Sequence, residues 1–227
     1  MNKQKIVWIV IIAIMTSCKP AKEVQTMGSI ERLDPSLDQI ISTDEKIEVL
    51  GEGYTWSEGP LWVESQKMLL FSDVPQDTIY KWTAEKGVEV YLTPSGYTGT
   101  EPSTSREPGS NGLTLNAKDQ LVLTMCGDRR IAVMDAPLDH PAPKYITLAD
   151  KYQGLRFDSP NDVVYDKQGN IYFTDPPYGF KLFEKDPAKE TKFQGIYKVF
   201  PNGKVISLVD TITKPNGIAL SPDQKFM

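Results

Sequence analysis

The chain has 227 residues, of which 40% are hydrophobic, 10% aromatic and 24% charged, and its formal net charge is −5. These proportions are typical of a soluble globular protein. The acidic balance argues against nucleic acid as a partner, because phosphate binding requires a positively charged surface.

The first residues have the pattern of a secretion signal. Residues 1–5 are basic and polar, residues 6–15 form an apolar run, and Thr16-Ser17-Cys18 closes it. An apolar run of this length is too short to span a bilayer as a helix. A small residue just before a cysteine resembles the bacterial lipobox, so we predict a lipoprotein signal peptide at 1–17 and lipidation of Cys18. The alternative is a plain secretory signal whose cleavage leaves a cysteine.

Lipidation would place the protein in the bacterial cell envelope, on the periplasmic or outer-membrane face, with membrane contact through the lipid anchor only. Residues 18–44 are polar and poor in pattern, and we interpret them as a lipidated tether. Cys126 is the only other cysteine, so we expect no disulfide. It ends a run of Leu, Val and Met residues, which favours a buried small hydrophobic side chain over a reactive nucleophile.

Between residues 45 and 227 one sequence pattern recurs. A polar residue opens each copy, and two short β-runs separated by a turn follow it. The clearest copy has Asn161, strands at 163–165 and 171–174, and a turn at 166–170. The copies begin roughly fifty residues apart, at Glu58, Asn111, Asn161 and Asn216. Short paired strands at this period predict a β-propeller, in which four-stranded blades surround a central channel.

Further β-runs complete each repeat. In chain order, strands are expected at 58–62, 68–73, 78–82, 88–92, 110–115, 121–124, 130–135, 144–148, 163–165, 171–174, 195–200, 204–209, 215–220 and 225–227. Trp56 and Trp62 flank Glu58, and we expect them to pack between strands. Residues 93–110 form a long loop rich in Pro, Ser, Thr and Gly, which is either a substrate lid or disordered.

The leading polar residues are candidates for one shared site. If each opens the innermost strand of its blade, all four side chains meet at one mouth of the channel. One carboxylate and several amide oxygens form an all-oxygen set that suits Ca²⁺, and the sequence has no Cys or His cluster that would indicate zinc. Amide ligands also keep the charge of the site low, so a bound divalent ion would stay electrophilic.

Five motifs follow one another along the chain. They are Glu-Gly-Pro-x-Trp with Leu-Leu-Phe-Ser-Asp (58–73), Ser-Pro-Asn-Asp-Val-Val (159–164), Ile-Tyr-Phe-Thr-Asp-Pro-Pro-Tyr-Gly (171–179), Gly-Ile-Tyr-Lys-Val (195–199) and Pro-Asn-Gly-Ile-Ala-Leu-Ser-Pro-Asp (215–223). Together they resemble the SMP-30/gluconolactonase/luciferin-regenerating-enzyme family. The resemblance implies an all-β, six-bladed β-propeller with a divalent metal in its channel. It further implies that Glu58, Asn161 and Asn216 are metal ligands and that Asn111 faces the substrate.

The resemblance also implies a lactone hydrolase. The expected reaction is hydrolysis of a sugar lactone or related small ester, in which water attacks a carbonyl polarised by the metal, with Ca²⁺ as the expected ion. The family's fourth ligand is an Asp that commonly serves as the base, and it would lie beyond residue 227. Asp162 is a weaker candidate base, because an Asp at a strand start more often binds backbone, as we expect for Asp73 and Asp175.

The alternative function is a non-catalytic, envelope-anchored propeller that binds a sugar or a protein and keeps the ion for structure, since fold alone does not decide activity. Six blades of this period need on the order of 300 residues, whereas about four blades' worth of chain is visible. We therefore expect a C-terminally truncated propeller that is inactive by itself. His140 lies in a loop-like sequence, and no serine-hydrolase or phosphate-binding motif occurs.

Overall fold

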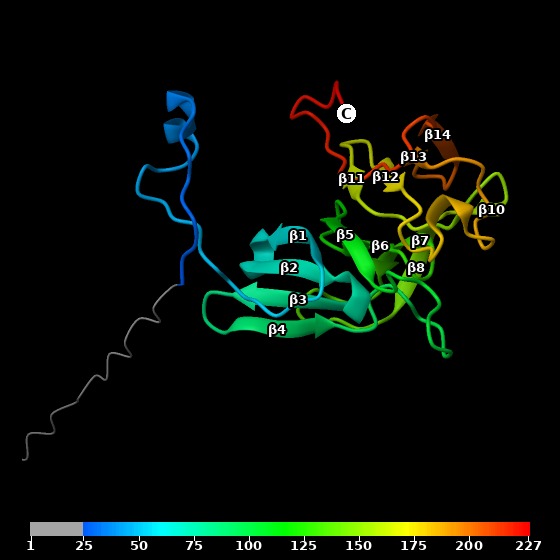
Figure 1. Ribbon diagram of the computed structural model, residues 1–227, viewed down its shortest axis with the longest axis horizontal. Coiled ribbons are helices and arrows are strands. Elements are labelled where there is room, and N and C mark those ends of the chain that lie inside the picture. Colours follow the sequence, from blue (N-terminus) through cyan, green and yellow to red (C-terminus); the bar gives the residue numbers. More distant parts are fainter. Residues whose placement is uncertain (1–24) are drawn as a thin grey trace, which may run out of the picture. The chain divides into compact units, whose positions relative to one another are not determined.

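The computed structural model in Figure 1 describes residues 25–227. The chain divides into two compact units, one ending at Val49 and one spanning Leu50–Met227. The predicted signal peptide at 1–17 and the predicted lipidation site, Cys18, lie outside the described residues. Within residues 25–227, no helix has both the length and the apolar character needed to cross a membrane.

The first unit has little regular structure. A single 3-10 helix, η1 (Pro35–Gln39), begins after Asp34, whose side chain accepts a hydrogen bond from the Ser36 backbone N–H. One isolated bridge pairs Thr26 with Glu48. The residues 25–44, which belong to the predicted tether, therefore contain a local turn of helix.

The second unit is all-β and contains three four-stranded antiparallel sheets, each with its strands in chain order. Sheet 1 comprises β1 (Ser57–Val63), β2 (Met68–Asp73), β3 (Thr78–Thr83) and β4 (Gly87–Leu92). Sheet 2 comprises β5 (Ser110–Leu115), β6 (Leu121–Met125), β7 (Arg130–Met134) and β8 (Tyr145–Ala149). Sheet 3 comprises β11 (Val163–Tyr165), β12 (Ile171–Asp175), β13 (Gly195–Val199) and β14 (Val205–Val209). These meanders have the strand order of propeller blades, as the repeat predicted.

Short elements connect and flank the sheets. The 3-10 helices are η2 (Glu64–Gln66), η3 (Val74–Gln76) and η4 (Phe183–Lys185). A two-stranded hairpin, β9 (Lys151–Tyr152) and β10 (Leu155–Arg156), lies between sheets 2 and 3 in the chain and was not predicted. Its turn contains Gln153 and Gly154, both with positive φ, which suits a tight hairpin.

Equivalent turns join the first two strands of sheets 2 and 3. Asn116 Oδ1 accepts hydrogen bonds from the backbone N–H groups of Lys118 and Gln120. Asp166 Oδ1 accepts in the same way from Gln168 and Asn170. A side chain that bonds its own turn in this way fixes the hairpin locally, which is why these turns could be recognised in the sequence.

The hydrophobic core lies between successive sheets. Leu121, Leu123 and Met125 of β6 belong to a cluster shared with sheet 1, whereas Val122 belongs to a cluster shared with sheet 3. Because successive strand residues point to opposite faces, sheet 2 is buried on both of its faces. This explains why β6 is buried along its whole length.

The fourth copy of the repeat differs from the prediction, because no strand forms in residues 210–227. No strand ladder forms there, and two side chains, one in β12 and one just before β11, bond the backbone of this segment. Thr174 Oγ1 donates to the Asn216 carbonyl at 2.7 Å, and the Ile218 N–H donates to Asp162 Oδ2 at 2.9 Å. These bonds place the segment against β11 and β12 without a neighbouring strand.

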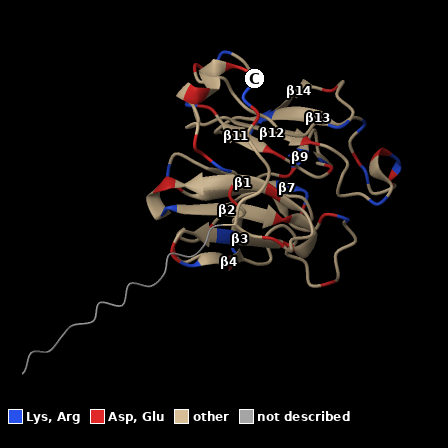
Figure 2. Ribbon diagram, turned by 60° about the vertical axis from the view of Figure 1, so that its left-hand side comes forward, with Lys and Arg blue, Asp and Glu red and all other residues tan. Residues whose placement is uncertain are grey.

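The predicted packing of Trp56 and Trp62 between strands is wrong, because each side chain is 48% exposed. Each indole N–H instead donates to the carboxylate two residues later, Trp56 to Glu58 at 2.8 Å and Trp62 to Glu64 at 2.6 Å. A nearby carboxylate satisfies each indole N–H, and neither ring is buried against a strand. Figure 2 shows acidic and basic residues interspersed along the strands and loops.

Candidate metal and substrate site

The first strands of the three sheets lie close together. Strand β5 contacts both β1 and β11, and the Gly112 N–H donates to the Asn161 carbonyl at 2.7 Å. A Cβ atom on Gly112 would lie 2.7 Å from that carbonyl oxygen, and one on Gly59 would lie 2.1 Å from the Asn111 oxygen. The glycine after Glu58 and after Asn111 therefore permits the close approach of neighbouring strands.

A row of hydroxyl groups links each sheet to the next leading polar residue. The Ser72 Oγ donates to the Asn111 carbonyl at 3.0 Å. Thr124 Oγ1 donates to the Asn161 carbonyl, and Thr174 Oγ1 to the Asn216 carbonyl, each at 2.7 Å. Because each hydroxyl lies near the end of the second strand of its sheet, the same contact is repeated three times. This repeated contact fixes the position of the following Asn backbone.

The four leading polar side chains consequently share one cavity of about 340 Å³. Glu58 lies at the start of β1, Asn111 in β5, Asn161 just before β11 and Asn216 after β14. The remaining lining residues are Trp56, Arg106, Glu107, Tyr178, Phe183 and Lys214. The structure therefore brings together every residue for which the sequence suggested a metal or substrate role.

The amide side chains of this cavity are free to bind a ligand. Asn111 and Asn161 are 5% and 3% exposed, and Asn216 is exposed. Within the described chain, none of the three amides forms a side-chain hydrogen bond, and none of their polar atoms is sealed from the cavity. Buried amides normally find partners, so the Asn111 and Asn161 side chains have hydrogen-bonding capacity left for a ligand in the cavity.

Glu58 supplies the one carboxylate among the four. Its side chain is half-buried, and Oε1 accepts the Trp56 indole N–H. The second carboxylate oxygen has no hydrogen bond among residues 25–227. A carboxylate and three amides present only oxygen acceptors toward a cation when the amide oxygens face inward, so the donor set fits a hard divalent ion such as Ca²⁺.

Two aspartates hold the backbone before the leading residues, as the sequence predicted. Asp73 accepts the N–H groups of Thr55 and Trp56 at 3.0 and 3.1 Å. Asp175 accepts those of Asp158 and Ser159, both at 2.8 Å. Burial, together with neighbouring Asp158, raises the pKa of Asp175 well above its usual value. These contacts orient the chain two or three residues ahead of Glu58 and Asn161.

Asp162, the weaker candidate for a base, is occupied by backbone contacts. Its Oδ1 accepts the Val163 N–H at 2.8 Å, and its Oδ2 accepts the Ile218 N–H at 2.9 Å. The side chain does not line the 340 Å³ cavity. The geometry therefore gives Asp162 a role in joining β11 to the segment that follows Asn216.

Sequence analysis missed Glu107, which lies in the loop between β4 and β5. Its side chain lines the cavity and is 5% exposed. Burial, with a smaller contribution from Glu58, raises the pKa of Glu107 to about 7 against an opposing effect of Arg106. No strand periodicity marks a loop residue. Its position four residues before Asn111 was the only available signal.

Two cations lie close to one aromatic ring beside the same cavity. The Arg106 guanidinium lies 4.6 Å from the Phe183 ring centroid, and the Lys214 ammonium lies 5.2 Å from it. The three residues come from three separate segments: the loop before β5, η4 and the segment after β14. Because cations are attracted to the ring face, Phe183 holds these segments together at the cavity.

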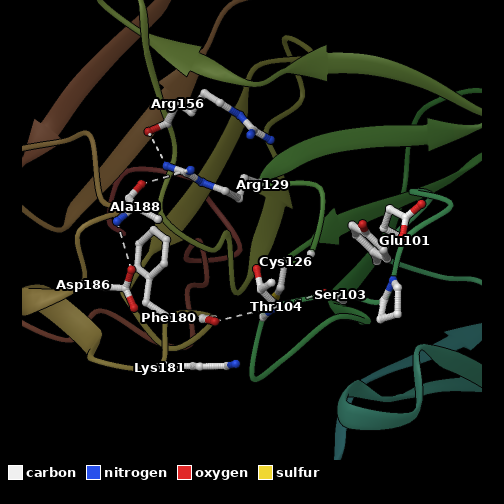
Figure 3. Close-up of a pocket in the computed structure, with 15 residues that line it drawn as sticks. Glu101, Ser103, Thr104, Cys126, Arg129, Arg156, Phe180, Lys181, Asp186 and Ala188 are labelled. Atoms are coloured by element: carbon white, nitrogen blue, oxygen red, sulfur yellow. Dashed lines mark hydrogen bonds between the residues drawn. The ribbon is translucent and has the colours of Figure 1, made fainter.

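A larger neighbouring cavity of about 570 Å³ contains none of the predicted metal residues. Figure 3 shows Arg129 pointing within it toward Arg156 and Ala188. The Arg129 guanidinium donates to the carbonyls of Phe157, Arg156 and Ala188 at 2.6, 3.4 and 3.2 Å. The Arg129 guanidinium is therefore occupied by backbone carbonyls of the surrounding loops. The larger volume of this cavity does not by itself identify it as the reaction site.

Cys126 also borders the larger cavity, and its predicted burial is confirmed at 1% exposure. The thiol donates to the Pro160 carbonyl at 3.1 Å. Burial raises the pKa of the Cys126 thiol well above its usual value, which disfavours the thiolate needed for a nucleophile. His140 is exposed and paired with Asp139, as expected for a surface loop.

Comparison with known proteins identifies the family of this chain. The family described as SMP-30/Gluconolactonase/LRE-like region matches residues 56–227. A gluconolactonase of Zymomonas mobilis is 38% identical over 200 residues, which cover 88% of this chain and 55% of the relative. The chain thus spans about half the length of that relative.

Solved structures give the same result for the fold. A gluconolactonase from Xanthomonas campestris aligns with a TM-score of 0.73 and 28% identity over 92% of this chain and 65% of its own. Regucalcin of Agrobacterium tumefaciens, a calcium-binding protein, aligns with a TM-score of 0.54 and 18% identity over 78% and 50%, which shows a shared fold. Three meander sheets, five ordered motifs and the family match over 56–227 together establish that the chain belongs to the SMP-30/gluconolactonase/LRE-like family.

Proposed function

We propose that the protein acts in the metal-dependent hydrolysis of a sugar lactone or related small ester. The observation that carries this proposal is the single cavity lined by Glu58 and by three asparagines whose amides have no hydrogen-bond partner among residues 25–227. Identity of 38% to a gluconolactonase supports the reaction class. The proposal extends to a six-bladed, closed propeller, of which the described sheets form three blades.

Glu58, Asn161 and Asn216 would hold the divalent ion, with Ca²⁺ as the ion that the oxygen donors suit best. When bound, this ion would polarise the lactone carbonyl as a Lewis acid. Hydrogen bonds within the chain hold the backbone of the proposed ligands in position. Thr124 and Thr174 fix the backbones of Asn161 and Asn216, and Asp175 fixes the segment that leads to Asn161.

The remaining groups would bind the substrate. The Asn111 amide is nearly buried in the cavity wall, so its N–H groups can donate to an oxygen of the lactone. Asp162 supplies no base in this scheme, because both carboxylate oxygens accept backbone N–H groups. The water that attacks the carbonyl is therefore activated by a group other than Asp162.

Calcium titration of the chain by calorimetry tests the metal site directly. Glu58→Gln should lower the affinity by at least about tenfold, since it removes the one charged ligand. Glu64→Gln is the matched control, because Glu64 likewise accepts an indole N–H from the tryptophan two residues before it but lies outside the cavity. Equal affinities for the two variants would exclude Glu58 as a ligand.

A panel of aldonolactones separates the enzyme from the alternative, a propeller that binds sugar or protein around a structural metal. Hydrolysis of a lactone gives an acid and therefore releases protons. Proton release that is abolished by EDTA, and that is absent in the Glu58→Gln variant, supports hydrolysis. Calcium binding without turnover of any lactone by the complete protein would instead support the binding function.

We also propose that the protein is anchored in the cell envelope through lipid on Cys18. The support is the sequence pattern of 1–18. Metabolic labelling with an alkynyl fatty acid should mark the protein, and Cys18→Ser should abolish the label. Cys126→Ser is the control that should keep it, because that thiol is buried in the fold. Persistent label in Cys18→Ser would refute the anchor.

A further inference from the structure

Glu107 presents a buried carboxylate to the cavity. The side chain is 5% exposed and lies in the wall that also contains Glu58, Asn111 and Asn161. It arises from the loop between β4 and β5, so its direction depends on how that loop is held.

Ser105 fixes the backbone of Glu107. Its Oγ accepts the Glu107 N–H at 3.1 Å. Its single O–H lies 3.0 Å from both the Glu107 carbonyl and the Gly179 carbonyl, and a bond to Gly179 ties the loop to the segment after β12. Glu107 is therefore held in position by a network that does not use its own side chain.

The Glu107 carboxylate has no protein partner. Among residues 25–227, no hydrogen bond and no ion pair reaches it. The neighbouring Arg106 is directed elsewhere, since its guanidinium lies over Phe183 and donates to the Tyr178 carbonyl at 3.5 Å. A buried carboxylate without partners is unfavourable, so a ligand that enters the cavity is the natural source of hydrogen-bond donors.

The chemistry of the group restricts that ligand. The Glu107 carboxyl group has an acceptor oxygen whether or not it is protonated, and the amides of Asn111 and Asn161 both donate and accept. An uncharged lactone offers hydrogen-bond donors to Glu107 only through O–H groups. Lactones that carry several ring hydroxyls meet this requirement, and lactones with unsubstituted ring carbons do not.

We propose that Glu107 accepts hydrogen bonds from substrate hydroxyl groups and thereby selects polyhydroxylated lactones over lactones that lack ring hydroxyls. This inference rests on the proposed lactone hydrolase for its reaction, and on the cavity alone for binding. A site built to bond a hydroxyl discriminates strongly against an analogue without it, because the protein group is then left unpaired.

Binding of a ligand that cannot be hydrolysed tests the inference independently of turnover. Calorimetry with 1,5-anhydro-D-glucitol should detect binding to the calcium-loaded chain, and tetrahydropyran, the same ring without hydroxyls, should not bind. Glu107→Ala should weaken binding of the polyol by roughly 10- to 100-fold. Glu107→Gln keeps the shape and one acceptor, and should weaken binding by a smaller factor, which guards against a folding defect in the alanine variant.

Glu101→Ala is the matched control, because Glu101 is an exposed glutamate of the same loop that does not line this cavity. It should leave polyol binding unchanged. Each variant should be titrated at a calcium concentration that saturates it, because Glu107 and Glu58 line one cavity and their charges interact, so that removal of Glu107 also changes calcium affinity. No polyol binding by the unmodified chain, or equal polyol binding with and without Glu107, would overturn the inference.

Hydrolysis gives a second readout in the complete protein. Glu107→Ala should lower kcat/KM for glucono-1,5-lactone by roughly 10- to 100-fold and that for δ-valerolactone by less than about threefold. An equal loss on both lactones would overturn the inference and assign Glu107 to the attacking water or to structure. If neither lactone is hydrolysed but the polyol binds through Glu107, the hydrolase proposal fails and the inference on Glu107 stands.

Discussion

Replacement of Gly112 by Ala tests how closely the inner strands must approach to form the site. A Cβ at this position would lie 2.7 Å from the Asn161 carbonyl oxygen and 2.8 Å from both Asp162 Cα and Asp162 Oδ1. Since carbon and oxygen atoms normally approach to about 3.3 Å, β5 and the chain at Asn161 must separate by roughly 0.6 Å.

The energetic consequence can be derived from the same contacts. Overpacking of a fixed backbone costs about 1–3 kcal/mol. The Gly112 N–H to Asn161 carbonyl bond, 2.7 Å in the native fold, would stretch beyond the usual range and lose part of about 1 kcal/mol. We therefore expect the free energy of unfolding to fall by about 2–3 kcal/mol. Calcium affinity should fall by at least about tenfold, because calcium–oxygen distances span only about 2.3–2.6 Å.

Gly217→Ala is a close control, since Gly217 also follows a leading Asn. A Cβ at Gly217 would have only Asp162 Oδ2 within 4 Å, at an ordinary van der Waals distance of 3.8 Å. This variant should unfold within about 0.5 kcal/mol of the unmodified chain and should bind calcium normally. Urea unfolding and calcium calorimetry measure both quantities. If Gly112→Ala is as stable and binds calcium as tightly as Gly217→Ala, close strand approach is not what assembles the site.

Three further outcomes are expected. Thr174→Val removes the hydroxyl that bonds the Asn216 carbonyl and should weaken calcium binding severalfold at a stability cost of about 1–2 kcal/mol; unchanged calcium affinity would contradict it. The pKa of Glu107 is raised from 4.5 to about 7, so the free energy of unfolding in EDTA should fall by at most about 3 kcal/mol as pH rises through that interval. Glu107→Gln should flatten this dependence of the unfolding free energy on pH, and identical pH profiles for the two proteins would refute the prediction. Tyr197→Phe should be neutral or stabilising by about 1 kcal/mol in thermal unfolding, because the buried Tyr197 hydroxyl has no partner among the described residues; a loss of stability would show that the hydroxyl is bonded.

Strand positions and the repeat could be predicted because they depend on local chemistry. The turns at Asn116 and Asp166 are stabilised by their own side chains, and the flanking runs are apolar or β-branched. The prediction failed for residues 215–220, because no ladder pairs them with residues 225–227 and a strand needs a hydrogen-bonded neighbour. It also failed for Trp56, which stays exposed while its indole N–H bonds the Glu58 carboxylate at the cavity.

The sequence by itself determined the all-β class, the family, and the polar residue that opens each repeat, since each of these is written in short contiguous motifs. Only the tertiary structure decided that one cavity is lined by Glu58, Asn111, Asn161 and Asn216, and that Glu107 lines it too. It also decided that both carboxylate oxygens of Asp162 accept backbone N–H groups. The physical reason is that a propeller site is made from side chains about fifty residues apart. Their distances depend on the packing of whole sheets and on loop contacts such as those of Ser105, which no local pattern encodes.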